Sequence, residues 1–80
     1  MKAIKNLITI DKKILGGTPV FHNTRVPVET LFWHLEDGIS LDDFLEDFPS
    51  VSKKQAVEVL KVAEKIIGSA NLQKIYEAAA

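Results

Sequence analysis

The residues of this sequence best suited to chemistry gather in one stretch, GGTPVFHNTRVPVETL at positions 16–31. The stretch holds two glycines, a histidine and the only arginine of the chain, which are residue types found in phosphate cradles and acid–base sites. A phosphate-binding P-loop needs the spacing Gly-x-x-x-x-Gly-Lys followed by Ser or Thr, and a dinucleotide site needs Gly-x-Gly-x-x-Gly. Neither spacing occurs, so we interpret the stretch as a folded corner whose turns are shaped by Gly16, Gly17, Asn23, Thr24, Arg25 and Pro27.

Metal and acid–base chemistry find little support elsewhere. His22 and His34 are twelve positions apart with no further ligand at metal spacing, whereas a zinc site needs at least about three protein ligands. The carboxylates of residues 36–47 belong to segments that we expect to be well hydrated, where nothing raises a carboxyl pKa towards neutrality. Because cysteine is absent, disulfides and thiolate chemistry are excluded. We therefore expect a protein that works without catalysis, metal or cofactor; an enzyme with chemistry at Thr24 and Arg25 is the rival hypothesis.

The net charge of the chain is −1, but its charged residues are distributed unevenly along the sequence. Residues 1–25 carry five basic and one acidic side chain (+4), residues 26–52 seven acidic and no basic ones (−7), and residues 53–80 five basic and three acidic ones (+2). A protein that coats nucleic acid without sequence preference would be basic throughout. The remaining possibility is local nucleic-acid binding through one basic end of the chain. No apolar run approaches the ~20 residues of a membrane span, and the start of the chain lacks the apolar core of a signal peptide. We expect a cytoplasmic protein.

The elements that must position these residues follow from turn signals and apolar spacing. Residues 4–10 and 20–22 predict two short strands of a β-hairpin. Apolar residues between positions 28 and 35 recur at the spacing of an amphipathic helix. Pro27 is suited to its first turn, and Gly38 would end it in a Schellman motif.

Two further helices follow, each with a capping signal. Ser40 is the expected N-cap of a short acidic helix that ends at Pro49. Ser52 is the expected N-cap of a longer helix, where Gln55 completes a capping-box pattern and Gly68 marks the end. The apolar face of this longer helix covers more than half of its circumference. We expect it to be buried against the core and against either a second subunit or the chain's own tail.

The chain would finish with a fourth helix formed by NLQKIYEAAA and capped by Asn71. The expected fold is therefore mainly α (a small α+β class): an N-terminal β-hairpin, a three-helix helix-turn-helix bundle and a C-terminal helix. We expect residues 1–68 to form the hairpin and helix-turn-helix domain and residues 69–80 to form a C-terminal helical tail.

The stretch SLDDFLEDFPSVSKKQAVEVLKVA has the order helix, turn, helix, and its second helix begins with Lys53, Lys54 and Gln55. In a DNA-binding helix-turn-helix the second helix presents such side chains to DNA, where glutamine can bond adenine and lysine can reach phosphate or guanine. A plain helical hairpin that only packs a core has the same pattern, and spacing alone does not decide between the two. The DNA-binding interpretation requires that these three side chains protrude together from a helix start that nothing else covers.

At the level of families, ILGGTPVFHNTRVPVETL followed by LEDGISLDDFLEDFPSVSKKQAVEVLKVA resembles the bacterial and archaeal domain of unknown function 433 (DUF433), over about residues 7–64. The shared boxes are Gly-x-Pro, Thr-Arg-hydrophobic-Pro-Val, Gly-hydrophobic-Ser and an acidic short helix that ends in aromatic-Pro. Asn23 stands where a glycine is usual before Thr-Arg, and asparagine tolerates the same backbone region. The family is similar to helix-turn-helix antitoxins of the VapB type, often encoded beside a PIN-domain ribonuclease toxin.

That resemblance implies a small dimer that binds its own operator DNA and neutralises the toxin with its C-terminal part. Carried over to this sequence, it implies DNA contacts at Ser52, Lys53, Lys54, Gln55 and Glu58. The toxin-facing residues would be Leu72, Ile75 and Tyr76, which lie beyond the family pattern and rest on amphipathicity alone. We therefore expect the antitoxin of a type II toxin–antitoxin pair, acting also as an autorepressor. The alternative is a protein-interaction module that blocks a partner without binding DNA.

Overall fold

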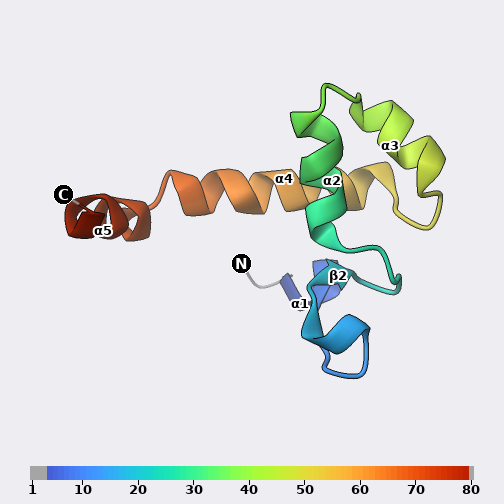
Figure 1. The fold of residues 1–80 in the computed structure, drawn as a ribbon, viewed down its shortest axis with the longest axis horizontal. Helices are drawn as coiled ribbons and strands as arrows, with labels where there is room; N and C mark the ends of the chain where they lie inside the picture. Colours follow the sequence, from blue (N-terminus) through green and yellow to red (C-terminus); the bar gives the residue numbers. More distant parts are fainter. Residues whose placement is uncertain (1–3, 80) are drawn as a thin grey trace.

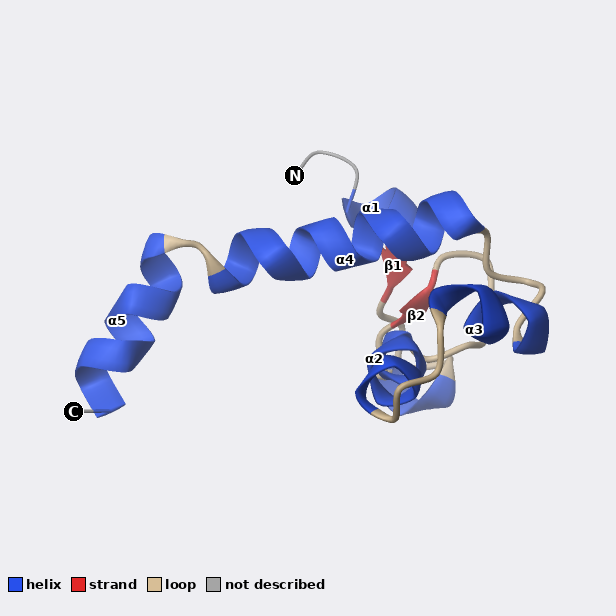
Figure 2. Ribbon diagram, turned by 90° about the horizontal axis from the view of Figure 1, so that it is seen from above, coloured by secondary structure: helices blue, strands red, loops and turns tan. Residues whose placement is uncertain are grey.

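The longest helix, α4, extends across the molecule; the hairpin, α2 and α3 lie beside its first half, and α5 lies beyond its other end (Figures 1 and 2). The computed structural model describes residues 4–79. In chain order the elements are α1 (Ile4–Leu7), β1 (Ile8–Thr9), the 3-10 turn η1 (Leu15–Gly17), β2 (Val20–Phe21), α2 (Val28–Glu36), α3 (Leu41–Asp47), α4 (Lys53–Ile67) and α5 (Ala70–Ala79). The predicted small α+β fold, with a two-stranded antiparallel hairpin before the main helices, is confirmed.

The N-terminal segment differs from the predicted strand over residues 4–10. The first four of the described residues form a turn of helix, α1, and only the two residues of β1 pair with β2. The amide of His22 still donates to the carbonyl of Leu7 at 2.9 Å, just beyond the ladder. One position further, the residue opposite Asn6 is Asn23, whose φ of 62° is left-handed and turns the chain out of the strand. With no partner strand to continue the ladder, the chain before β1 forms a helical turn instead.

The two turns of the corner adopt the left-handed backbone region where the sequence predicts it. Gly16, Gly17 and Asn23 have φ values of 67°, 95° and 62°. Leu15 joins them with a φ of 48°, which no sequence signal predicts and which costs a residue with a β-carbon roughly 1–2 kcal/mol.

Thr24 holds the turn that follows β2. Its hydroxyl donates to the carbonyl of Phe21 at 2.8 Å and accepts the amide of Val26 at 3.1 Å. Pro27 comes next in an extended conformation (φ −60°, ψ 137°) and is the cap residue of α2, so it lies just before the first helical turn for which its ring is suited. Residues 16–27 therefore form the folded corner that the sequence predicts, and the corner leads directly into α2.

The ends of the main helices follow their local signals. α2 closes in the predicted Schellman motif, because the amides of Gly38 and Ile39 bond back to helix carbonyls at 3.0 and 2.9 Å and Gly38 has a φ of 80°. The hydroxyl oxygens of Ser40 and Ser52 accept backbone amides in the first turns of α3 and α4, at 3.1 and 3.0 Å. Both serines are therefore N-caps, as predicted.

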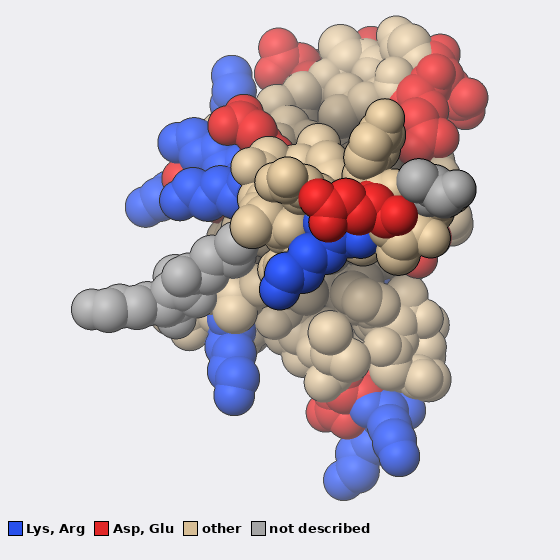
Figure 3. Space-filling model, turned by 90° about the vertical axis from the view of Figure 1, so that its left-hand side faces the viewer, with Lys and Arg blue, Asp and Glu red and all other residues tan. Residues whose placement is uncertain are grey.

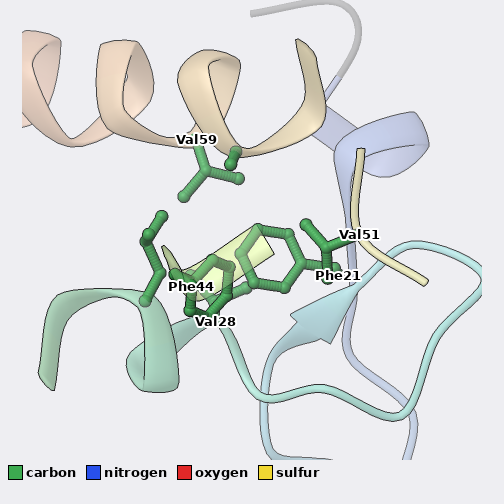
Figure 4. Close-up of a cluster of buried hydrophobic side chains, with 7 residues drawn as sticks. Phe21, Val28, Phe44, Val51 and Val59 are labelled. Carbon is green, nitrogen blue, oxygen red and sulfur yellow. The ribbon is translucent and has the colours of Figure 1, made fainter. Parts of the chain in front are cut away.

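A single hydrophobic core lies between the first half of α4, the hairpin and the helices α2 and α3 (Figure 4). The rings of Phe21 and Phe44 meet at its centre with centroids 6.1 Å apart. His34 packs its ring edge-on against Phe44 and Phe48, and its Nδ1 donates to the carbonyl of Thr30 at 2.7 Å. The buried side chains are Val20, Phe21, Val28, Leu31, Phe44, Val51, Ala56 and Val59.

The second half of α4 and all of α5 extend beyond this core (Figures 1 and 2). We call the last two residues of α4 together with α5, residues 66–79, the C-terminal arm. On α4, Val59 is 2% exposed, whereas Ile66 and Ile67 are 54% and 62% exposed. The chain's own tail thus leaves this end of the apolar face uncovered, and burial by a second subunit stays a prediction. α5 begins at Ala70 because Ser69, and not the predicted Asn71, provides the cap: its hydroxyl accepts the Asn71 amide at 3.2 Å. No helix within residues 4–79 combines the length and the apolar content that crossing a membrane requires.

Candidate functional site

The start of α4 carries the five residues for which DNA contacts are expected. Ser52 is the N-cap, Lys53 and Lys54 are exposed, and Gln55 and Glu58 are half-buried. The two lysines reach solvent because their positions in the first turn face away from the core. The five residues are neighbours in space, as expected for consecutive positions of one helix, but they differ in what they contact.

Gln55 does not protrude with the lysines, so that expectation is wrong. Its Nε2 donates to the carbonyl of His22 at 3.1 Å and, more weakly, to that of Leu7 at 3.4 Å. These carbonyls belong to the end of the hairpin, where the strand ladder stops. The capping box is therefore only half formed: the Gln55 backbone amide bonds Ser52, while the side chain turns to the hairpin instead of back to the Ser52 amide.

Lys53 faces the acidic helix α3. Its Nζ lies 3.8 Å from Oδ1 of Asp42, and both side chains are largely exposed. Such a pair between exposed side chains contributes only ~0–1 kcal/mol, so it leaves Lys53 available for other contacts. Glu58, one turn further, lies 3.6 Å from Nζ of Lys61 and is thus partly neutralised.

An open cleft of about 640 Å³ lies between the hairpin and the start of α4. It brings Ser52, Lys54, Gln55 and Glu58 of the helix start together with four residues that are far from them in the sequence: Asn6, Leu7, His22 and Asn23. His22 forms part of its wall and is held by Thr9, whose Oγ1 lies 2.9 Å from Nδ1 of the imidazole. No local spacing could have revealed this cleft, because its two walls meet only through tertiary contacts.

Arg25 forms no ion pair with Glu29 or with any other carboxylate of the described residues. Within the described part of the chain, the ion pairs are those of Lys53 with Asp42 and of Lys61 with Glu58. Arg25 is exposed and follows the turn that Thr24 braces. Its guanidinium is therefore presented to solvent by a well-defined piece of backbone.

The residues predicted to face a protein partner all lie on the C-terminal arm. Leu72, Ile75 and Tyr76 are 37%, 65% and 77% exposed, and α5 has no buried residue. Ile66 and Ile67, at the end of α4, are exposed as well, so the described part of the chain leaves apolar side chains uncovered on both helices of the arm. The sequence predicted this face, and the structure adds that it stands well away from the core.

Charge separates along the molecule. In Figure 3, Asp and Glu side chains crowd the upper end, where α2 and α3 lie in Figure 1, and Lys side chains stand out at the opposite end and along one side. The separation agrees with the acidic block of residues 26–52. A partner can therefore meet either an acidic end or a basic one, depending on its direction of approach.

A family model and a solved structure name the same family for the proteins that this chain resembles. The family model described as "Protein of unknown function (DUF433)" matches residues 8–63. An uncharacterised protein of Sinorhizobium fredii, y4eO, is 36% identical over 55 residues, which are 69% of this chain and 25% of that protein, so the chain spans about a quarter of this relative's length. The crystal structure of a DUF433 member from Anabaena variabilis matches with a TM-score of 0.66 and 23% identity, over 96% of this chain and 71% of that one. At that identity the likeness concerns the fold alone.

Proposed function

The chain belongs to the DUF433 family, and from this membership together with its exposed C-terminal arm we propose that it is the antitoxin of a type II toxin–antitoxin pair. In this proposal the arm binds and neutralises a PIN-domain ribonuclease toxin in the cytoplasm. The helix-turn-helix domain, as a homodimer, binds operator DNA and represses the pair's own transcription. The protein acts by binding, without catalysis.

The single observation that carries the proposal is the state of α5. A helix of ten residues with none of them buried is marginal in water, because isolated helices shorter than about 12–15 residues rarely gain enough from their own hydrogen bonds. The apolar side chains of the arm would gain this missing stabilisation in the groove of a partner, in the manner of amphipathic helices that dock by one face. Exposed apolar patches of this kind mark protein-binding surfaces.

The acidic block of α2 and α3 supports the same proposal. Seven carboxylates without a basic residue between positions 26 and 52 create a negative end of the molecule. A ribonuclease must attract RNA and therefore presents basic surface, to which such an end is complementary. Complementary charge would raise the association rate more than the final affinity, and high salt would slow the encounter.

Co-expression with the ribonuclease encoded beside its gene tests the antitoxin proposal. Ile75→Glu puts a charge on the apolar face of α5, and Gln73→Glu puts the same charge away from that face. We expect Ile75→Glu to lose both co-purification with the toxin and rescue of growth, and Gln73→Glu to keep both. Ile75 is 65% exposed, so both variants should fold like the wild type, which circular dichroism checks. Full rescue by Ile75→Glu would refute the role of the arm.

The DNA-binding half of the proposal rests on the lysines at the start of α4. As a dimer, the protein would present two such helices to successive major grooves, about 34–36 Å apart. A mobility-shift assay with the DNA upstream of the gene should show a complex with the wild type. Lys53→Glu combined with Lys54→Glu should abolish it, whereas Lys65→Glu combined with Lys74→Glu, which makes the same change of charge on the distal part of the chain, should preserve it.

A second candidate function is a protein-interaction module that does not bind DNA. Two features make the start of α4 less suited to contacting DNA bases and therefore favour this alternative. Gln55 is bonded to the hairpin, and Asp42 lies beside Lys53. In that case the wild type would co-purify with its partner and give no shift with the upstream DNA at about 100 mM salt, where specific complexes normally survive.

A further inference from the structure

We propose that the turn of residues 22–25 and Lys54 form one phosphate-binding surface, in which Asn23, Arg25 and Lys54 contact the sugar–phosphate backbone of a nucleic acid. The inference rests on the DNA-binding half of the proposed function and assigns its backbone contacts to a part of the chain that the sequence marks only as a turn. It also predicts the side from which DNA approaches α4, namely the hairpin side.

The first support is that the turn is fixed to the helix. The side chain of Gln55 bonds the carbonyl of His22, the residue directly before Asn23, at 3.1 Å. Asn23 and Lys54 consequently line the same open cleft, one from each wall. Arg25 is two residues from Asn23, so their Cα atoms are at most about 7.6 Å apart, and its long side chain adds to that reach.

The second support is that the turn is rigid before any ligand binds. Thr24 accepts and donates one hydrogen bond each within the turn, and Asn23 holds its left-handed conformation. The exposed side chains of Asn23 and Arg25 therefore start from an ordered backbone. Less conformational entropy is lost on binding from such a backbone than from a mobile loop.

The third support is the distribution of charge around the first turn of α4. The α3 side of the helix start carries Asp42, which lies beside Lys53. On the hairpin side the only carboxylate that lines the cleft, among the described residues, belongs to Glu58, and Lys61 lies 3.6 Å from it. Lys54 and Arg25 have no carboxylate within ion-pair distance in the described part of the chain. Each side of the helix start thus has one carboxylate paired with a lysine, and the difference between the sides is the positive charge of Lys54 and Arg25, which no described carboxylate within ion-pair distance offsets.

The chemistry of the three side chains fits phosphodiesters. Arginine binds phosphate through its planar fork, lysine binds it as a point charge, and an asparagine amide donates to phosphate oxygens without adding charge. Such contacts position a protein on a duplex without reading its sequence. Base contacts would remain with Lys53 and Glu58, whereas Gln55 acts as a positioning residue that holds the turn in place.

The test is a fluorescence-anisotropy titration of the duplex upstream of the gene, repeated between about 0.05 and 0.2 M salt, the range where phosphate contacts dominate. Arg25→Gln and Lys54→Gln should each reduce affinity roughly eightfold at 0.1 M salt and each lower the slope of log affinity against log salt by about 0.9, since each removes one phosphate contact. Lys65→Gln, which removes the same charge from the last turn of α4, should change neither quantity. All three side chains are exposed, so circular dichroism should be unchanged.

Three results would overturn the inference. If the wild type binds the duplex and Arg25→Gln binds it with the same affinity and salt slope, the turn makes no phosphate contact, while the DNA-binding proposal stands. If the wild type binds no DNA in the assay, the inference and the DNA-binding half of the proposed function fall together. If poly-glutamate displaces the duplex as effectively as unlabelled DNA of equal charge, the surface recognises acidic peptide and not phosphodiester.

Discussion

Replacing Gln55 by leucine tests how the hairpin is attached to α4. Leucine is apolar and one bond shorter, and it removes the Nε2 donor that bonds the carbonyls of His22 at 3.1 Å and Leu7 at 3.4 Å. The helix cap is retained, because Ser52 bonds the backbone amide of residue 55 and not its side chain. The substitution therefore isolates one long-range tertiary contact.

The expected loss follows from the geometry of these bonds. The bond to His22 has an ordinary length, whereas the one to Leu7 exceeds the usual ~3.2 Å limit, so one good and one weak hydrogen bond are lost. A carbonyl left without a donor costs about 1–3 kcal/mol when buried, and less where water can replace the donor, as the open cleft permits here. We expect a loss of about 1–2 kcal/mol. For a domain of this size that lowers the Tm by about 5–15 °C.

Thermal and urea unfolding followed by circular dichroism measure this loss. Lys54→Leu is the matched control, since it introduces the same side chain at the next position, which is exposed and makes no hydrogen bond or ion pair within the described residues. The reasoning would be refuted if the free energies of unfolding of Gln55→Leu and Lys54→Leu agreed within about 0.3 kcal/mol, which is the error of additive comparisons.

Gln55→Glu adds a pH dependence to the same test. At neutral pH its carboxylate would face two carbonyl oxygens in a half-buried position, so its pKa should be raised above the value in the unfolded chain. The protonated acid can donate a hydrogen bond as the amide does. Relative to the wild type, the variant should therefore be least destabilised near pH 4 and lose stability as the pH rises through the raised pKa. A difference in the free energy of unfolding between Gln55→Glu and the wild type that is constant between pH 4 and pH 7 would contradict this explanation.

Three further predictions concern the scaffold and are measured by urea unfolding. Ser52→Ala removes the cap of α4 and should cost about 1 kcal/mol, whereas Ser50→Ala, at an exposed position without a side-chain hydrogen bond in the described part of the chain, should cost little; equal effects would contradict the cap. Asn23→Ala should cost about 1 kcal/mol because alanine disfavours a φ of 62°, and Asn23→Gly should cost less; the reverse order would contradict the turn geometry. Phe44→Ala should cost about 3–5 kcal/mol because Phe44 is fully buried at the centre of the core, and a loss below about 1 kcal/mol would contradict that position.

The local features of this fold were predictable because their partners lie within a few residues. The caps at Ser40 and Ser52, the Schellman ending at Gly38 and the left-handed Asn23 all follow from residue types and short-range hydrogen bonds. The amphipathic spacing of the three main helices predicted which face each one buries. Two short-range features were not predicted: the left-handed conformation of Leu15, and the cap of α5, where Ser69 and Asn71 offer competing signals two positions apart.

The extent of the hairpin was not predictable in this way. Residues 4–10 are rich in β-branched types and suit a strand, but a strand exists only where a partner strand pairs with it. β2 ends at Phe21, and the turn at Asn23 removes the next pairing position, so α1 takes the helical conformation. The strand propensity of residues 4–7 was therefore overridden because β2 is too short to pair with them.

By itself, then, the sequence determined the three main helices, the caps at Ser40 and Ser52, the turns at the glycines and Asn23, and the apolar face of the arm, since each depends on interactions within a few positions along the chain. Only the tertiary structure decided which surfaces these elements present. The bonds of Gln55 join residues 33 and 48 positions apart, and the cleft beside Lys54 is lined by the two segments that these bonds connect. No local pattern encodes such contacts, because the free energy that selects them comes from the packing of the whole core, which brings the hairpin against the first turn of α4.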